Sequence, residues 1–327
     1  MNVYIRSVGS FIPEKRVTND DLSKIMDTSD EWIKSHTGIE NRHVAEKGVT
    51  AADLAAGAAK VALERADLTA EELDMIILTT ATPDYMGFPA TACVVQDRIG
   101  AKNAGAFDMV AGCTGFIYAI DNAKNMILAG TAKNVLVVGT EVLTQVSNMQ
   151  DRDTAVLFGD GSGAVIISEA PGKVSSMEHA ILKSDGSGAE VLMRKVGGIK
   201  YPFVDGETTF NDTALYMDGQ AVYKFAVKVN TNLIKELLER SNLTIDEIKW
   251  IIPHQANIRI LQAAAKRLRI PLEKFYFNLM EYANTSSASI PIALNEVYEK
   301  GLIKRGDNIL FTGFGAGLTY GGTIVKW

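Results

Sequence analysis

The amino-acid sequence repeats itself: three short segments of its first half reappear, in the same order, in its second half. The matched pairs are LTAEELDMII (68–77) with LTIDEIKWII (243–252), KNVLVVG (133–139) with DNILFTG (307–313), and LFGDGSGAVIIS (157–168) with GFGAGLTYGGTIV (313–325). Three matches in one order predict two copies of a single folding unit. We expect the halves to be residues 1–172 and 173–327, because Pro and Gly follow an apolar run within 169–176.

The pattern of apolar residues predicts an α/β fold. Continuous runs rich in Val and Ile are typical of strands that helices cover on both faces. These runs lie at 75–78, 135–138, 165–167, 250–252, 309–311 and 323–325. Segments with the 3.6-residue spacing of helices lie between them, at 50–66, 114–130 and 221–240. The stretch 193–212 has little periodicity, so we expect it to run over the surface or over the active site.

Composition excludes several classes of protein. The 327 residues are 47% hydrophobic and 22% charged, with a net charge of −6, which is ordinary for a globular protein and disfavours a general nucleic-acid binder. No apolar run approaches a membrane span, and the N-terminus lacks a signal-peptide pattern. Two cysteines cannot form a disulfide framework, so we expect a reducing cytoplasm. The sequence has no spacing typical of a metal site.

Cys113 lies between two glycines in MVAGCTGFIYAI (109–120), where a strand-like stretch gives way to a helical pattern. This placement puts the sulfur at the positive end of a helix dipole, which lowers the pKa of a thiol and favours the nucleophilic thiolate. Gly112 allows a tight turn and leaves room for an acyl group. The alternative is a small buried hydrophobe, because free cysteine is often buried. Cys93, within the helical pattern 88–100, is assigned to the core.

Two further polar residues stand at the ends of predicted elements. His254 follows the apolar run 250–252, and ligands of open α/β sheets gather at the carboxyl ends of strands. A hydrogen-bonded loop histidine would give the same pattern. Asn284 precedes a run of small residues that opens a helix, in a segment that corresponds to the Cys113 region. The duplication predicts that Cys113 and Asn284 face each other across a pseudo-twofold axis, although a simple turn residue is the alternative for Asn284.

Two glycine strings, FGDGSG (158–163) and FGAG (314–317), lack the Lys-Ser/Thr of a phosphate-binding loop and precede strands rather than helices. We interpret them as tight turns that bring backbone N–H groups close to a substrate oxygen.

Four motifs together resemble those of the β-ketoacyl-acyl-carrier-protein synthase III family, condensing enzymes of the thiolase superfamily. They are VAGCTGF (110–116), IIPHQANIRI (251–260), EYANTSSAS (281–289) and GFGAGLTYG (313–321). The stretches 27–43 and 151–165 resemble that family too, so the similarity spans nearly the whole chain in the right order. It implies a thiolase-like five-layered αβαβα fold made of two duplicated halves, and a homodimer.

The resemblance also implies a reaction, a decarboxylative Claisen condensation that initiates fatty-acid synthesis. An acyl-coenzyme A primer and malonyl-acyl-carrier protein would give a 3-oxoacyl-acyl-carrier protein, CO2 and coenzyme A. Cys113 would carry the acyl group, while His254 and Asn284 would stabilise an enolate by donating hydrogen bonds. Backbone N–H groups of Cys113 and Ala316 would hold the oxyanion. This chemistry needs no metal or other cofactor, and neither a membrane nor a nucleic acid is expected as a partner.

Further residues match binding positions of the family. Trp32 and Arg152 would sandwich the adenine of coenzyme A. Thr28, Gly219 and Asn257 match the coenzyme groove. Leu143 and Phe158 match the acyl pocket, and Phe88 matches a residue that borders it across the dimer interface. The matches for docking of an acidic carrier protein are Lys224, Arg259, Lys266 and Arg267. The last three of these share one face of a helical pattern, and such a stripe steers an acidic partner. A surface anchor for Trp32 and a solvated helix face for the stripe are the alternatives.

Three positions depart from the family pattern. His36 stands where arginine is usual, and Ala283 and Ala316 stand where glycine is usual. They leave the catalytic groups in place but bear on coenzyme A binding and on rate. Two other functions stay open: a related thiolase-superfamily acyltransferase, such as a starter enzyme of secondary metabolism, and more remotely a thiol hydrolase with Cys, His and Asn in the same order. The acyl chain of the primer is not specified by the sequence.

Overall fold

The computed structural model describes residues 2–172 and 174–327. Lys173, at the predicted join of the two halves, lies outside the described residues. The strands are β1 (Val3–Phe11), β2 (Arg16–Thr18), β3 (Asn41–His43), β4 (Met75–Thr79), β5 (Gly105–Met109), β6 (Asn134–Val142), β7 (Asp160–Glu169), β8 (Ser176–Met177), β9 (Ile181–Ser184), β10 (Leu192–Arg194), β11 (Leu215–Met217), β12 (Ile248–Pro253), β13 (Asn308–Gly315) and β14 (Thr319–Lys326). All six predicted strands are confirmed within this set.

The α-helices are distributed among the strands along the chain. They are α1 (Asn19–Ser23), α2 (Asp30–Thr37), α3 (Ala51–Ala66), α4 (Thr91–Ile99), α5 (Gly115–Leu128), α6 (Arg152–Ala155), α7 (Phe210–Thr213), α8 (Gly219–Ser241), α9 (Ile258–Leu268), α10 (Leu279–Tyr282) and α11 (Ser289–Glu299). The three predicted helices correspond to α3, α5 and α8. None of the helices described combines the length and the apolarity that crossing a membrane requires.

Two mixed sheets form the frame of the molecule, and they are built alike. The first has the strand order β1-β7-β6-β4-β5, and the second has the order β12-β13-β14-β8, with β9 also paired to β14. In the first sheet β4 and β6 are parallel and β7 is antiparallel to β6. In the second, β12 and β13 are parallel and β14 is antiparallel to β13. The segments that repeat in the sequence therefore fold into equivalent strands.

The repetition extends to the way each core strand begins. A 3₁₀ turn precedes β4 at Ala70–Glu72, and another precedes β12 at Ile245–Glu247. In both turns a threonine N–H donates to the glutamate carboxylate three residues later at 2.8 Å. This reciprocal cap is encoded by the Leu-Thr-x-x-Glu pattern of each half, so local sequence fixes where both strands start.

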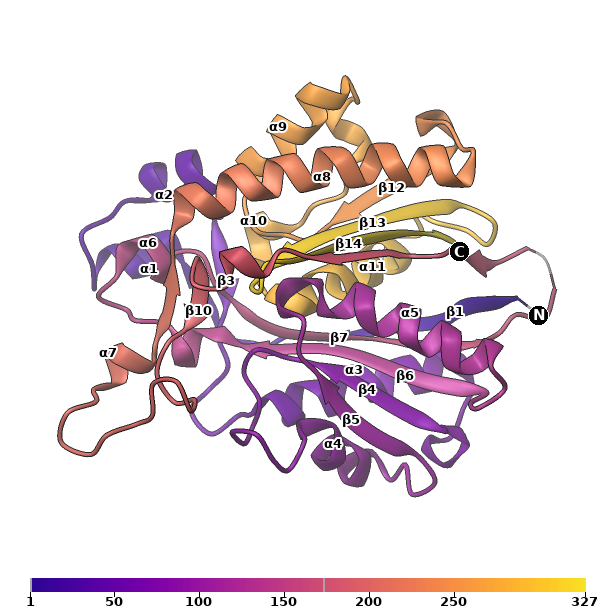
Figure 1. Cartoon of the computed structure of the whole chain (residues 1–327), viewed down its shortest axis with the longest axis horizontal. Helices are drawn as coiled ribbons and strands as arrows, with labels where there is room; N and C mark the ends of the chain where they lie inside the picture. The colour runs from indigo at the N-terminus through magenta and orange to yellow at the C-terminus, as the bar shows by residue number, and fades with distance from the viewer. Residues whose placement is uncertain (1, 173) are drawn as a thin grey trace.

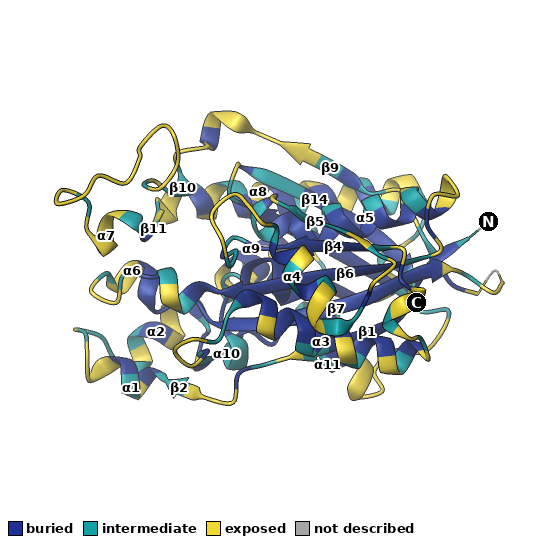
Figure 2. Ribbon diagram, turned by 90° about the horizontal axis from the view of Figure 1, so that it is seen from below, coloured by how far each residue is buried: buried dark blue, intermediate teal, exposed yellow. Residues whose placement is uncertain are grey.

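The elements stack in five layers (Figure 1). Helices α5 and α11 lie between the two sheets, and one buried cluster, which includes Ile120, Leu294 and Phe311, joins them to both inner faces. Helices α3 and α4 cover the outer face of the first sheet, and α8 and α9 cover that of the second. Figure 2 shows the sheet strands buried at the centre, while the segment around α7 is exposed. The predicted thiolase-like αβαβα fold is confirmed.

The assignment of Cys93 to the core is wrong. Cys93 lies in α4 and is exposed. Its neighbours Ala92 and Val95 turn toward the first sheet and are fully buried. The helical pattern identified the element correctly, but the side chain of Cys93 is on its outer face.

Candidate active site

Cys113, His254 and Asn284 all line one cavity of about 470 Å³. Cys113 lies in a 3₁₀ turn, Gly112–Thr114, that leads into α5. His254 directly follows β12, and its own N–H donates to the carbonyl of Thr312 on β13 at 2.8 Å. Asn284 follows α10, and its N–H donates to the carbonyl of Leu157 at 2.9 Å. Three polar groups from distant parts of the chain thus meet at one end of the two sheets.

The turn that carries Cys113 has a counterpart in the second half, Ser286–Ala288, which leads into α11. Each turn packs on the central strand of the opposite half. A Cβ on Gly315 of β13 would collide with the backbone of Cys113, and a Cβ on Gly139 of β6 would collide with the carbonyl of Ser287. In this register Ser287 is the counterpart of Cys113, and Asn284 lies three residues earlier. The predicted equivalence of Cys113 and Asn284 therefore holds for the segment but not for the residue.

Gly112 adopts a φ of +54°, in the left-handed region that favours glycine, as the tight-turn interpretation requires. A Cβ at Gly112 would lie 2.9 Å from the backbone nitrogen of Ala316, so this stretch of the second half lies directly against the turn. The hydroxyl of Thr319 links the two, 2.7 Å from the carbonyl oxygen of Ala111 and 3.1 Å from that of Ala316. Ala283 has a φ of +57°, a backbone conformation in which alanine is strained.

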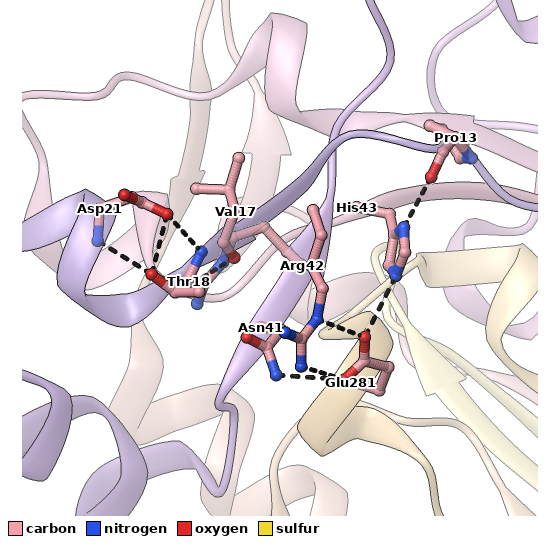
Figure 3. Close-up of polar contacts among 9 residues, drawn as sticks. Pro13, Val17, Thr18, Asp21, Asn41, Arg42, His43 and Glu281 are labelled. Atoms are coloured by element: carbon pink, nitrogen blue, oxygen red, sulfur yellow. Dashed lines mark hydrogen bonds and ion pairs between the residues drawn. The ribbon is translucent and has the colours of Figure 1, made fainter.

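The side-chain amide of Asn284 has a fixed orientation. Its Oδ1 accepts the N–H of Ser286 at 2.8 Å, which leaves the Nδ2 hydrogens as the free donors. The preceding helix α10 is held through Glu281, whose carboxylate accepts from Arg16 at 2.7 and 2.9 Å and from Asn41 at 3.1 Å. Figure 3 shows Glu281 also facing His43, at 3.3 Å. The hydrogen bond from Arg16 is the main reason that the pKa of Glu281 is lowered.

His254 is only 2% exposed, and its Nδ1 lies 2.8 Å from the hydroxyl of Ser289. The ring of Phe314 meets the imidazole edge-on, with centroids 5.2 Å apart. Burial lowers the pKa of His254 to about 3. The imidazole is therefore neutral at physiological pH, and it can act as a hydrogen-bond donor or acceptor but does not carry a resting charge.

The thiol of Cys113 differs from the expectation of a lowered pKa. Burial raises the pKa of Cys113 to about 12; a hydrogen bond from Ser286 opposes the rise and the charge of Glu141 adds to it. A helix N-terminus stabilises an anion by about 0.3–1 kcal/mol, which is less than desolvation costs here. The sequence revealed the helix end but not the depth at which the turn is buried.

Glu141 is a buried carboxylate that the sequence analysis did not single out. It accepts hydrogen bonds from the hydroxyl of Ser287 at 2.8 Å, from the N–H of Ala81 at 3.0 Å and from the hydroxyl of Thr82 at 3.0 Å. It therefore ties the second-half turn to the first sheet. Glu141 stands near the carboxyl end of β6, so the strand-end argument that identified His254 applies equally to it.

Three of the five predicted coenzyme residues line the cavity. Gly219, Asn257 and Trp32 line it, as does His36. The His36 ring stacks on the indole of Trp32 at 4.4 Å between centroids, and the guanidinium of Arg152 lies 4.4 Å from the indole centroid. Arg152 thus contacts Trp32 directly, without the gap that a sandwiched adenine needs. Thr28 is not among the lining residues, and its buried hydroxyl has no hydrogen-bond partner within residues 2–172 and 174–327.

Of the predicted acyl-pocket residues, Leu143 and Phe158 line the cavity. Phe88 does not line it and is 88% exposed on the surface. The stretch 193–212 is mostly exposed, as expected, while the short strands β10 and β11 that flank it contribute Leu192, Leu215 and Met217 to the cavity wall.

The predicted docking residues are all exposed, on two neighbouring helices. Lys224 lies on α8, and Arg259, Lys266 and Arg267 lie on α9. These helices pack against each other over the second sheet (Figure 1).

Known proteins match the chain over its full length. The family model of 3-oxoacyl-[acyl-carrier-protein] synthase III matches residues 107–186, and the model of its C-terminal part matches 238–327. The β-ketoacyl-[acyl-carrier-protein] synthase III of Caldanaerobacter subterraneus is 49% identical over 99% of this chain and 97% of its own. The crystal structure of 3-oxoacyl-[acyl-carrier-protein] synthase III from Aquifex aeolicus has a TM-score of 0.91 at 44% identity, covering 99% of this chain and 100% of its own. The priming β-ketosynthase of the R1128 polyketide pathway has a TM-score of 0.92 at 32% identity, covering 99% and 96%.

Proposed function

Because the chain belongs to the β-ketoacyl-acyl-carrier-protein synthase III family, we propose that Cys113 is its acyl-carrying nucleophile and that His254 and Asn284 stabilise the enolate. As a member of this family the chain is an acyltransferase that initiates fatty-acid synthesis. It condenses an acyl-coenzyme A primer with malonyl-acyl-carrier protein, with loss of CO2, to give a 3-oxoacyl-acyl-carrier protein. The observation that carries the residue assignment is the convergence of these three side chains in one cavity.

In the first half-reaction the sulfur of Cys113 loses its proton and attacks the thioester carbonyl of the acyl-coenzyme A. The carbonyl oxygen becomes an oxyanion, which accepts hydrogen bonds from the N–H groups of Cys113 and Ala316. The carbon–sulfur bond to coenzyme A then breaks, and its thiolate takes up a proton. The packing of Ala316 against the Cys113 turn supports this pair of donors.

In the second half-reaction malonyl-acyl-carrier protein enters the same cavity and loses CO2. The electron pair left behind forms an enolate, whose oxygen accepts hydrogen bonds from Nε2 of His254 and Nδ2 of Asn284. The enolate carbon attacks the acyl carbonyl, and Cys113 departs as a thiolate that is protonated again. Each donor of this kind is typically worth about 10²–10³ in rate. The thioesters supply all of this chemistry, so we propose no further cofactor.

The substrates bind on two surfaces. Coenzyme A lies along the groove of Thr28, Trp32, Arg152, Gly219 and Asn257, with Arg152 swinging away from the indole so that adenine can enter. The carrier protein docks on the exposed patch made by Lys224, Arg259, Lys266 and Arg267. Leu143 and Phe158 enclose the acyl group.

We propose that the enzyme is a homodimer joined at β5. This strand is at the edge of the first sheet, where unpaired backbone groups are free to pair with a second copy. Large apolar side chains are exposed directly after this strand, at Val110, which is 84% exposed, and in the loop before α4, at Phe88. In such a dimer Phe88 borders the acyl pocket of the partner. The cytoplasmic location stays a prediction that rests on the two unpaired cysteines.

A starter enzyme of secondary metabolism is the alternative function. The likeness to the R1128 priming ketosynthase favours it, but that protein is 32% identical, against 49% and 44% for the synthase III relatives. A panel of acyl-coenzyme A primers, assayed with malonyl-acyl-carrier protein, distinguishes the two and identifies the preferred acyl chain.

Acylation is tested by incubating the protein with acetyl-coenzyme A and measuring its intact mass. We expect one acetyl group on the wild type and on Cys93→Ala, and none on Cys113→Ala. His254→Ala and Asn284→Ala should still be acetylated but should lose decarboxylation of malonyl-acyl-carrier protein. Acetylation that persists in Cys113→Ala, or wild-type condensation in both of the other variants, would refute the assignment.

A further inference from the structure

The molecule has a second cavity, of about 810 Å³, that the mechanism above does not use. Its walls come from β2 and α1, from β3 and the residues that follow it, and from the stretch after β6. Among the described residues, Phe158 is the one that lines both this cavity and the candidate active site. The volume is in the range of sites that hold a small organic ligand.

One wall of the second cavity contains a buried arginine, Arg42 on β3, which is 2% exposed. Its guanidinium donates to the carbonyl oxygens of Val17 at 3.4 Å and Val156 at 3.1 Å. Its Nε has no hydrogen-bond partner within residues 2–172 and 174–327. Burial lowers the pKa of Arg42 to about 10, so the side chain is still charged at neutral pH. A buried charge is costly unless it is paired, and Arg42 therefore has a donor left for an anion.

The charges around the second cavity favour an anion as well. The cationic side chains that line it are Lys15, Arg16, Arg42 and Lys47. Asp21 is the acidic residue among the described lining residues, and its carboxylate already accepts from Lys24 at 2.7 Å and from Thr18 at 2.8 Å (Figure 3). Arg16 is held by Glu281. The other three cations give the cavity a positive potential, which attracts a negatively charged ligand.

Most of the remaining wall is apolar, which narrows the class of anion. The apolar lining residues are Val17, Leu22, Ile25, Val44, Ala45, Met149, Ala155 and Phe158. Ile25 is 63% exposed, so an apolar ligand would cover a side chain that otherwise faces water. A guanidinium matches the planar shape of a carboxylate, and apolar walls disfavour a more highly charged phosphate. We propose that this cavity binds an alkyl carboxylate, with its charged group on Arg42 and its chain against Leu22 and Ile25.

The test is calorimetric titration of the full chain with sodium decanoate, below its micelle concentration and at a pH where the carboxyl group is ionised. Decanol supplies the same chain without the charge, and inorganic phosphate supplies a charge without the chain. We expect saturable binding of decanoate, and binding about tenfold weaker or worse for each of the other two probes. Arg42→Gln should weaken decanoate binding about tenfold or more, because it removes a hydrogen bond between two charged groups.

Two matched variants show which of the two cavities holds decanoate. Ile25→Glu places a carboxylate in the second cavity, and Leu192→Glu places one in the candidate active site. Because like charges repel, Ile25→Glu should weaken decanoate binding about tenfold or more, whereas Leu192→Glu should bind it as the wild type does. Ile25 is exposed, so its replacement does not disturb the core, and this pair decides the question even if Arg42→Gln fails to fold.

Absence of decanoate binding would overturn the proposal. Equal affinity for decanol would show a purely apolar site, and equal affinity for phosphate would show a general anion site, so either result would overturn it as well. Binding that Leu192→Glu abolishes and Ile25→Glu leaves intact would place decanoate in the candidate active site and refute the second one. The proposal does not depend on the catalytic assignment, because none of these titrations requires acylation of Cys113.

Discussion

The reactivity of Cys113 should keep rising with pH far beyond the range of an ordinary thiol. Alkylation by iodoacetamide requires the thiolate, so its rate reports the thiolate fraction. The variant Cys93→Ser leaves Cys113 as the single cysteine, because the chain contains two. Alkylation of this variant at pH 7, 8, 9 and 10 isolates the thiol of Cys113, which is half-buried in the cavity wall.

The magnitude follows from burial. A rise in the pKa of Cys113 from 9.0 to about 12 means that the surroundings favour the neutral thiol by about 4 kcal/mol. At pH 7 the thiolate fraction is then about 10⁻⁵, against about 10⁻² for an unperturbed thiol. The rate should increase about tenfold for each pH unit, without a plateau, up to pH 10. Glu141→Gln removes a neighbouring carboxylate that raises the pKa, so it should increase the rate at every pH.

The assay is the loss of unmodified Cys113 by intact mass, with the variant that also lacks Cys113 as the blank. A plateau below pH 9 would mean that the helix N-terminus outweighs desolvation. In that case the enzyme would hold a thiolate at rest, and no proton acceptor would be needed for acyl transfer.

Three further results are expected. Gly112→Ala should slow acetylation at least tenfold, because alanine there combines a strained φ with a Cβ close to Ala316. Gly130→Ala is the control: its φ is also positive, at +74°, but the space around it is open, so the acetylation rate should not change. Equal acetylation rates for the two variants in burst kinetics would contradict this prediction. Ala283→Gly should raise the free energy of unfolding by about 1 kcal/mol, because glycine adopts the positive φ of this position without strain. The measurement is urea denaturation, and a free energy of unfolding below that of the wild type would show that the alanine is not strained. Arg259→Ala should weaken the salt dependence of KM for malonyl-acyl-carrier protein, while Lys60→Ala, exposed on α3, should not; equal slopes would count against the docking patch.

The fold could be predicted because its signals are local and occur twice. The reciprocal caps at Thr69 and Thr244 lie six and four residues before the strands that they start, and the buried strands appear as continuous apolar runs. Because each cap and each apolar run occurs in both halves, the two halves independently predict the same order of elements. The exposure of Cys93 could not be predicted, because it depends on which face of α4 turns toward the sheet.

The candidate site was predictable in its residue types and less so in its chemistry. Cys113, His254 and Asn284 stand at element ends, where the sequence itself marks them. The pKa of Cys113, however, depends on how deeply the second half buries the first, and Glu141 and Ser289 act through contacts with residues 146 and 35 positions away. Such contacts leave no pattern in a single sequence. From the sequence alone, a serine or a glutamate at these positions is predicted to be a surface or capping residue.

The crossed packing of the two turns has a consequence for genetics. Gly139 supports the turn that follows Asn284, and Gly315 supports the turn that carries Cys113, so each half holds the other's catalytic segment in shape. A polypeptide severed between β7 and β8 would give two fragments, neither of which has a finished site. Activity would return only on mixing, in proportion to the product of their concentrations. Gly139 belongs to the first fragment, but a substitution there would misplace Asn284, which belongs to the second. Only an intact first fragment would then restore activity.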